Sequence, residues 1–242
     1  MSAVRFTLDD ATFAPWTGRG ITIGVIDSGI NANHPHVGRA ESGVHLLADG
    51  EDEDTTDRLG HGTAVAAAIR EKAPGVALVA VRVFDRSLAT SGDVLARAIH
   101  WAADHDCSLI NLSLGTANPA SDEPLREAVA HAQRCGAILV SARAYDGVRC
   151  LPGRLEGVAG VLVDRQCARD EMRLSIDTDG TPVFCASGLP RPIPGLPEER
   201  NLSGISFAVA NVTGFLARFL EARPDIRAVA QLRSVLLAGQ IA

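Results

Sequence analysis

Three short motifs place an aspartate, a histidine and a serine in that order along the 242-residue chain: Asp27 in VIDSG, His61 in GHGT and Ser206 in SGISFA. A serine hydroxyl is a poor nucleophile until an imidazole takes its proton, and a buried carboxylate fixes the tautomer of that imidazole. The order Asp, His, Ser is one of the orders in which proteins carry this triad. The motifs therefore predict nucleophilic catalysis by Ser206, with His61 as general base and Asp27 as the group that orients it.

Each of the three residues has an ordinary alternative when it is taken alone. Asp27 could stabilise a turn, His61 could be a hydrogen-bonded core or capping histidine, and Ser206 could be only a helix N-cap. The catalytic interpretation is favoured because all three occur together on the expected elements. Asp27 ends a strand pattern, where parallel sheets build their sites, and Ser206 opens a helix whose dipole and free N–H groups can stabilise an oxyanion.

The segments that must position these residues alternate between strand and helix patterns. Short β-branched runs predict strands over residues 21–26, 77–83, 108–113, 137–140, 158–163 and 183–186. Helical spacing of apolar residues predicts helices over residues 62–70, 92–104, 123–134, 206–221 and 227–237. This alternation implies an α/β fold, a mostly parallel sheet with helices on both faces. No repeat or linker divides the sequence, which predicts a single domain over residues 1–242.

Composition and charge argue against several classes of protein. The net charge of -6 gives no basic face for nucleic acid, and we expect neither a signal peptide nor a membrane-spanning segment. The five cysteines are scattered without a C-x-x-C pair, so free core thiols in a reducing compartment are favoured over disulfides or a zinc site. We therefore expect a cytoplasmic protein without metal or cofactor, and its oligomeric state stays open. The acidic run at residues 51–54 is expected to be a solvated loop, with a cation site or a preference for basic substrates as the alternative.

The motifs resemble those of the subtilisin-like serine peptidases, the subtilases, from about residue 20 to residue 224. Residues 20–29 are similar to the aspartate strand of that family, and residues 60–67 to its histidine helix. Residues 204–214 are similar to its serine helix, G-T-S-M-A-S-P-H-V-A-G. The resemblance implies a subtilisin-like three-layer fold and a serine endopeptidase whose catalytic triad is the aspartate, histidine and serine of the three motifs.

A further segment, LINLSLG at residues 109–115, is close to the I-N-M-S-L-G strand of the family. In subtilases this strand pairs antiparallel with the substrate backbone and forms a wall of the P1 pocket. The resemblance implies that a peptide binds here as an added extended strand, with a second strand of the protein on its other side. The substrate-binding residues implied in this way are Leu88, Ala89, Thr90, Ser113, Leu114, Gly115, Ala144 and Cys150.

The sequence departs from the family at positions that bear on activity. The family segment A-A-G-N, whose asparagine completes the oxyanion hole, corresponds here to ARAY, which places Tyr145 at the asparagine position. We expect either that the Tyr145 hydroxyl donates to the oxyanion or that the ring packs outward and backbone groups serve alone. The serine helix also differs, with Ile205 and Phe207 in place of threonine and methionine. Cys150 falls where the family often has a glycine at the base of the P1 pocket, which would favour small P1 residues.

Two segments of many secreted subtilases have no counterpart in this sequence. Their histidine helix is interrupted by a calcium loop, whereas the pattern over residues 64–72 is continuous here, and only 26 residues precede Asp27. Both observations favour an intracellular processing protease that trims a precursor or leader peptide and does not need calcium. The alternative is a pseudoenzyme or peptide-binding scaffold with weak or no cleavage, which Tyr145 and the altered serine helix support.

Overall fold

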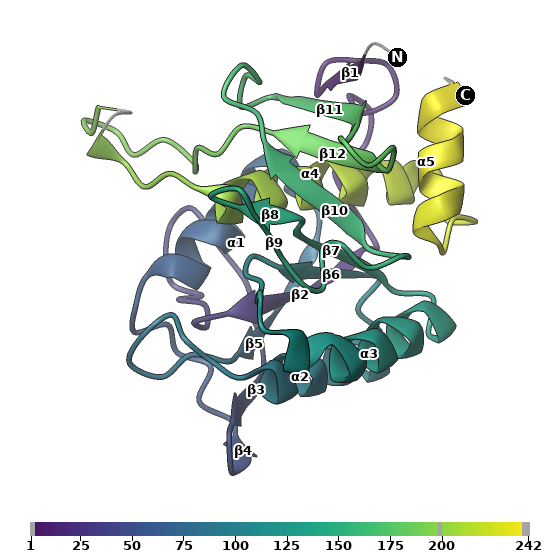
Figure 1. Cartoon of the computed structure of the whole chain (residues 1–242). Helices are drawn as coiled ribbons and strands as arrows, with labels where there is room; N and C mark the ends of the chain where they lie inside the picture. Colours follow the sequence, from purple (N-terminus) through teal and green to yellow (C-terminus); the bar gives the residue numbers. More distant parts are fainter. Residues whose placement is uncertain (1–2, 198–199, 239–242) are drawn as a thin grey trace.

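The computed structural model describes residues 3–197 and 200–238, and its centre is a ten-stranded sheet of order β1-β11-β12-β10-β7-β6-β2-β5-β3-β4 (Figure 1). The strands are β1 (Val4–Thr7), β2 (Thr22–Asp27), β3 (Glu41–Leu47), β4 (Gly50–Asp52), β5 (Ala77–Arg82), β6 (Leu109–Leu112), β7 (Ile138–Ala142), β10 (Ala159–Val163), β11 (Glu171–Ile176) and β12 (Pro182–Ala186). Neighbouring strands from β12 to β3 pair in parallel, and antiparallel pairs lie at the two edges. A separate hairpin contains β8 (Ala144–Tyr145) and β9 (Val148–Arg149).

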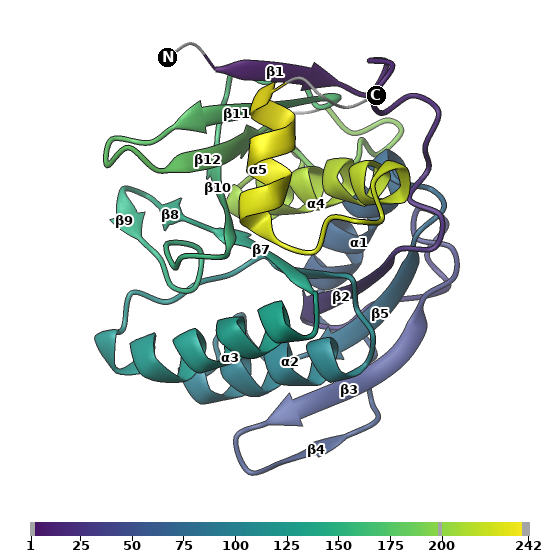
Figure 2. The same cartoon turned by 90° about the vertical axis from the view of Figure 1, so that its right-hand side faces the viewer.

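Helices cover both faces of the sheet (Figure 2). On one face lie α2 (Gly92–Asp104) and α3 (Asp122–Arg134), and on the other lie α1 (His61–Lys72), α4 (Ile205–Ala222) and α5 (Val229–Ala238). One buried apolar cluster joins the sheet to α1, α4 and α5, and a second joins it to α2 and α3. This three-layer arrangement around a mostly parallel sheet confirms the predicted fold class.

The serine-bearing helix α4 is the central helix of its layer. Most of its side chains are buried, including Phe207, Phe215 and Phe219, and each such side chain contributes about 1.5–3 kcal/mol by leaving water. By length and composition α4 could cross a membrane, although no membrane-spanning segment was expected from the sequence. However, 78% of this apolar stretch is buried inside the protein, as in the core helix of a globular domain.

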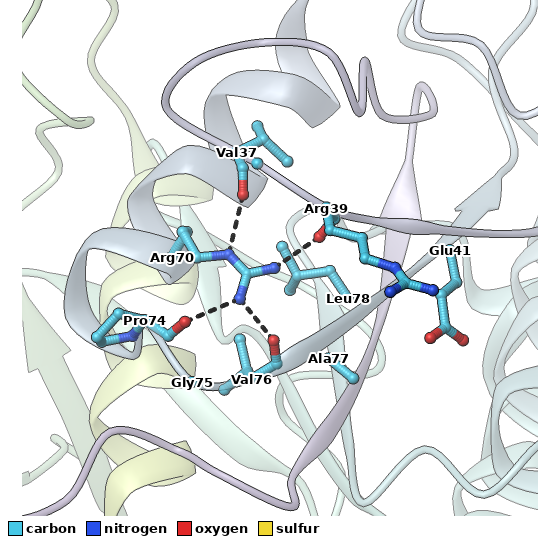
Figure 3. A pocket seen from close by; sticks show the side chains of 10 residues that line it. Val37, Arg39, Glu41, Arg70, Pro74, Gly75, Val76, Ala77 and Leu78 are labelled. Carbon is cyan, nitrogen blue, oxygen red and sulfur yellow. Dashed lines mark hydrogen bonds between the residues drawn. The ribbon is translucent and has the colours of Figure 1, made fainter.

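The histidine-bearing helix α1 runs without interruption over its twelve residues. Arg70 lies in the last turn of α1 and forms hydrogen bonds to two neighbouring loops (Figure 3). Its guanidinium donates to four backbone carbonyls at 2.5–3.1 Å, those of Val37, Arg39, Pro74 and Val76. These bonds fix the point at which the chain leaves α1 and turns toward β5.

Every predicted helix and strand is present, with ends displaced by no more than two residues. The strands β1, β3, β4, β11 and the β8–β9 hairpin were not predicted, because these segments show polar or mixed patterns rather than apolar runs. The prediction of a loop at residues 51–54 was wrong for the first two of them. Glu51 and Asp52 belong to β4, an exposed edge strand that pairing with β3 creates without any apolar periodicity.

Candidate active site

Asp27 is the last residue of β2, and its side chain is completely buried. Its Oδ1 accepts hydrogen bonds from the backbone N–H of Ser28 and from Nδ1 of His61, both at 2.7 Å. In the neutral imidazole a proton on Nδ1 leaves Nε2 unprotonated, which is the tautomer that a general base needs. Oδ2 of Asp27 is buried without a partner among the described residues, so Oδ1 alone orients the imidazole.

Two glycines allow the start of α1 to approach the loop after β2. Gly60 has a φ of 82°, a left-handed conformation that favours glycine. A Cβ on Gly62 would lie 2.2 Å from the carbonyl oxygen of Gly29, so only glycine permits this contact. The GHG sequence therefore places His61 against Asp27.

Asp57, which was not singled out from the sequence, joins the aspartate and histidine motifs. Its Oδ1 accepts from Ser28 Oγ and the Gly60 N–H, both at 2.8 Å. Its Oδ2 accepts from the N–H and the hydroxyl of Thr63 at 2.9 and 2.5 Å. Burial alone would raise the pKa of Asp57, but these hydrogen bonds hold it below its usual value. The only sequence signal was an aspartate four residues before His61, in a position to cap the first turn of α1.

The electrostatic surroundings of His61 favour its charged form. Burial lowers the pKa of the imidazole, but the hydrogen bond and the charge of Asp27, together with the charge of Asp57, outweigh that effect. The net result is a His61 pKa raised above its ordinary value of 6.5. The imidazole can therefore hold the proton that it would take from a nucleophile.

Ser206 is the second residue of α4, and its hydroxyl is hydrogen-bonded to the end of the β6 segment. Oγ of Ser206 donates to the carbonyl oxygen of Ser113 at 2.9 Å, and Ser113 Oγ donates to the carbonyl oxygen of Ser206 at 3.2 Å. A hydroxyl carries one proton, so in this rotamer Ser206 does not donate to His61. Transfer of the proton to Nε2 requires rotation of the serine side chain.

A buried polar chain holds β6 and α4 in register beside Ser206. Asn111, completely buried on β6, donates through Nδ2 to Ser113 Oγ at 2.8 Å. The hydroxyl of Thr213, also completely buried on α4, lies 2.9 Å from Oδ1 of Asn111. Breaking such a buried contact leaves an unsatisfied polar group, so this chain fixes the carbonyl of Ser113 relative to Ser206.

A cavity of about 740 Å³ brings His61 and Ser206 together. Five of the predicted substrate-binding residues line it: Leu88, Ser113, Leu114, Gly115 and Cys150. The other three, Ala89, Thr90 and Ala144, are not among the residues that line this cavity, and their predicted contact with a peptide stays a prediction. Ala89 and Thr90 lie in the short segment between Leu88 and Ser91, the N-cap of α2, and Ala144 lines a neighbouring cavity of about 1140 Å³.

Tyr145 lines the same cavity from β8 and is 63% exposed. The tight turn that follows, with positive φ at Asp146 and Gly147, brings the short hairpin back along β9. The ring therefore stands at the rim of the cavity, a position that fits either of the two roles expected from the sequence.

Cys150 is buried directly behind Gly115 in the cavity wall. A Cβ on Gly115 would lie 2.7 Å from Cβ of Cys150, so the two segments touch at van der Waals distance. Burial raises the pKa of the Cys150 thiol, although a backbone hydrogen bond from Tyr145 acts against this. Cys150 is therefore a neutral packing group in the wall of the cavity, and its predicted effect on the P1 residue stays a prediction. Among the described residues, no group of three metal-ligating side chains borders this cavity.

Comparisons with protein families, known sequences and solved structures all find subtilases or other proteases. The sequence matches the Subtilase family over residues 18–146. It is 29% identical to Thermitase of Thermoactinomyces vulgaris over 92% of this chain and 84% of that protein. It is 32% identical to Subtilisin-like protease 1 of Arthroderma otae over 60% of this chain but only 31% of that longer protein. The solved structure of the prenylagaramide maturation protease PagA is similar, with a TM-score of 0.61 and 27% identity over 85% of this chain and 77% of that chain.

Proposed function

The chain belongs to the subtilase family, and we propose that this serine endopeptidase uses Asp27, His61 and Ser206 as its catalytic triad. The observation that carries the proposal is the 2.7 Å hydrogen bond between His61 and Asp27, beside a cavity that His61 shares with Ser206. A buried carboxylate, an oriented imidazole and a serine at a helix N-terminus are the parts that acyl transfer needs.

The substrate peptide binds as an extended strand beside residues 113–115. The carbonyl oxygen of Ser113 then accepts a hydrogen bond from a backbone N–H of the peptide. Because this oxygen accepts from Ser206 Oγ in the free protein, the peptide replaces the serine hydroxyl as its donor. The released hydroxyl rotates toward Nε2 of His61, so substrate binding itself prepares the nucleophile.

Acylation begins when Ser206 Oγ attacks the scissile carbonyl carbon and Nε2 of His61 takes the hydroxyl proton. Asp27 stabilises the imidazolium, which then gives the proton to the leaving amine as the C–N bond breaks. Water, deprotonated by the same nitrogen, hydrolyses the acyl-enzyme and restores Ser206. The backbone N–H of Ser206 at the start of α4 stabilises the oxyanion, with the Tyr145 hydroxyl as the side-chain donor.

The role proposed for this activity is the trimming of a precursor or leader peptide in the cytoplasm. One similar structure, PagA at 27% identity, is named a maturation protease. All five cysteines are free thiols, which suits a reducing compartment. Two steps test this role: a search of the neighbouring genes for one that encodes a precursor peptide, and incubation of any such peptide with the protein, read by mass spectrometry. We expect one cut at a fixed junction, and equal cutting of casein at many sites would contradict it.

A pseudoenzyme that binds peptides without cleaving them is the second candidate. Two observations favour this candidate. The Ser206 hydroxyl donates to the Ser113 carbonyl rather than to His61, and Tyr145 occupies the position of the family asparagine. A fluorophosphonate probe separates the candidates, because only an activated serine reacts. We expect labelling that maps to Ser206, survives in Ser203→Ala and disappears in His61→Ala. Ser203 is an exposed serine lining the same cavity and so serves as the matched control. Absence of labelling in the wild-type protein would support the pseudoenzyme.

A further inference from the structure

Four metal-binding side chains gather on the layer opposite α4, at the ends of α2 and α3. His100 and Asp104 are four residues apart in the last turns of α2, and His131 and Cys135 are four residues apart at the end of α3. Residues separated by four positions lie on the same face of a helix. Because α2 and α3 pack side by side, the two pairs meet at the junction between them (Figure 2).

The separations between these groups are close to those of a tetrahedral zinc site. Nε2 of His131 lies 3.7 Å from Sγ of Cys135 and 2.6 Å from Oδ1 of Asp104. One ligand atom from each of these three residues lies within 4.8 Å of the others. Zinc bonds of about 2.0–2.3 Å place neighbouring ligand atoms about 3.3–3.7 Å apart in a tetrahedron. The site therefore needs side-chain adjustments on the order of 1 Å to reach the geometry that zinc prefers.

His100 lies beside these three residues, but its ring nitrogens are outside the group of ligand atoms within 4.8 Å of one another, so the side chain must move to become the fourth ligand. The centroid of its ring lies 4.5 Å from that of His131, with the two planes tilted by 32°. With this imidazole the set becomes two nitrogens, one sulfur and one carboxylate oxygen. Such a set suits zinc, whereas calcium and magnesium take oxygen ligands.

The surrounding charge also favours a cation. Both helices direct their C-terminal ends at the cluster, so the negative ends of two helix dipoles meet there. No basic side chain occupies the last turn of α2, and the last turn of α3 carries Arg134 besides His131. A bound thiolate and carboxylate together supply the two negative charges that neutralise Zn²⁺.

Cys135 differs from the other cysteines in a way that fits a ligand. It is exposed, whereas Cys107, Cys150 and Cys167 are buried and Cys185 is half-buried. It therefore makes little contribution to core packing and is open to a metal from solvent.

We propose that His100, Asp104, His131 and Cys135 form a zinc site that links the C-terminal ends of α2 and α3. Binding replaces the Cys135 S–H bond by an S–Zn bond and releases that proton to solvent. His131 ligates through Nε2 as a neutral ring: solvent takes the Nε2 proton that bonds Asp104 and supplies a proton to Nδ1. The site lies outside the cavity of Ser206, so the inference does not depend on the proposed triad.

Cobalt and zinc titrations of the 242-residue protein test the site. Cobalt bound by the thiolate gives a sulfur-to-metal charge-transfer band and intense visible bands typical of tetrahedral geometry. We expect both bands in the wild-type protein, bleaching of both by one equivalent of zinc, and no effect of calcium or magnesium. Zinc at about a hundredfold above its Kd is expected to raise the Tm by about 5–10 °C.

Matched variants complete the test. Cys135→Ser, His131→Ala and His100→Ala are each expected to weaken zinc binding by at least about tenfold. His105→Ala is the control, because His105 ends the same helix but its ring stacks on Trp101 and bonds the Trp101 carbonyl. All four side chains are at least partly exposed, so unchanged circular dichroism is expected in each variant. Unaltered cobalt spectra in Cys135→Ser, or equal loss of zinc binding in His105→Ala, would overturn the proposal.

Discussion

Replacing Asp27 by asparagine removes the charge that orients His61 while keeping the size of the buried side chain. Oδ1 of Asp27 accepts two hydrogen bonds at 2.7 Å, from Ser28 N–H and from the imidazole. Asparagine can still place its amide oxygen at this position and accept both bonds, because the position of Oδ2 has no partner among the described residues. The tautomer of His61 is then kept, but no buried negative charge stabilises the imidazolium that forms when Nε2 takes the Ser206 proton. The same change of aspartate to asparagine lowers kcat by about 10⁴ in another serine protease with this triad.

The same substitution should move the pH profile in a defined direction. Asp27 contributes the hydrogen bond and charge that raise the pKa of His61, so its removal leaves burial as the dominant effect and lowers that pKa. His61 is protonated and inactive below its pKa, so the wild-type acid limb of kcat/KM lies above pH 6.5. The contribution of the raised His61 pKa to folding stability has the opposite pH dependence from the activity. It is fully present below about pH 6.5 and is lost as the pH rises through the folded-state pKa.

The assay is kcat/KM against pH with one peptide substrate, for the wild type, Asp27→Asn and the exposed control Asp49→Asn. We expect the acid limb of Asp27→Asn to lie at lower pH than that of the wild type, and Asp49→Asn to match the wild type. An acid limb that stays in place or moves to higher pH in Asp27→Asn would refute the assigned role of Asp27.

Three further predictions concern Tyr145, Asp57 and calcium. Tyr145→Phe is expected to lower kcat by at least about tenfold with little change in KM, because one side-chain donor to an oxyanion contributes a factor of about 10²–10³ in kcat. Unchanged steady-state kinetics would show that backbone N–H groups alone stabilise the oxyanion. Asp57→Ala removes the acceptor of five hydrogen bonds around the start of α1. Urea unfolding should therefore show a loss of at least about 1–3 kcal/mol in the free energy of unfolding, against little change in Asp49→Ala. Calcium is expected to leave the Tm unchanged because α1 runs unbroken, and a rise in Tm on adding calcium would contradict this.

The helices were the most predictable part of the fold because their apolar faces and caps lie within the segment itself. The predicted range for α2, residues 92–104, is the observed one, and Ser91 Oγ caps it by accepting from the Val94 N–H at 3.2 Å. The missed strands depend on partners far along the chain. Antiparallel pairing with β12 and β1 makes a strand of β11, and the polar start of β11 at Glu171 hides it from any local pattern.

The candidate active site was likewise predictable only in part from the sequence. The motifs that carry the triad are continuous in sequence, whereas the contacts that hold it are not. Arg143 is an example of a contact that the sequence did not predict, because it occupies the position of a small residue in the family pattern. Its guanidinium is buried and donates to Asp177 at 2.7 Å and to Asp179 at 2.6 Å. The diverted Ser206 hydroxyl and the two-helix cluster around His131 likewise depend on side chains that only the tertiary fold brings together.

The most direct measurement of the central claim compares peptide hydrolysis by Ser206→Ala and Ser203→Ala. Both substitutions remove one hydroxyl from residues that line the same cavity, and only Ser206 is assigned as the nucleophile. We expect Ser206→Ala to lose activity on the order of 10⁶ in kcat, as when a triad member is removed from a subtilisin, and Ser203→Ala to keep the wild-type rate. Hydrolysis by Ser206→Ala at the wild-type rate would contradict the account.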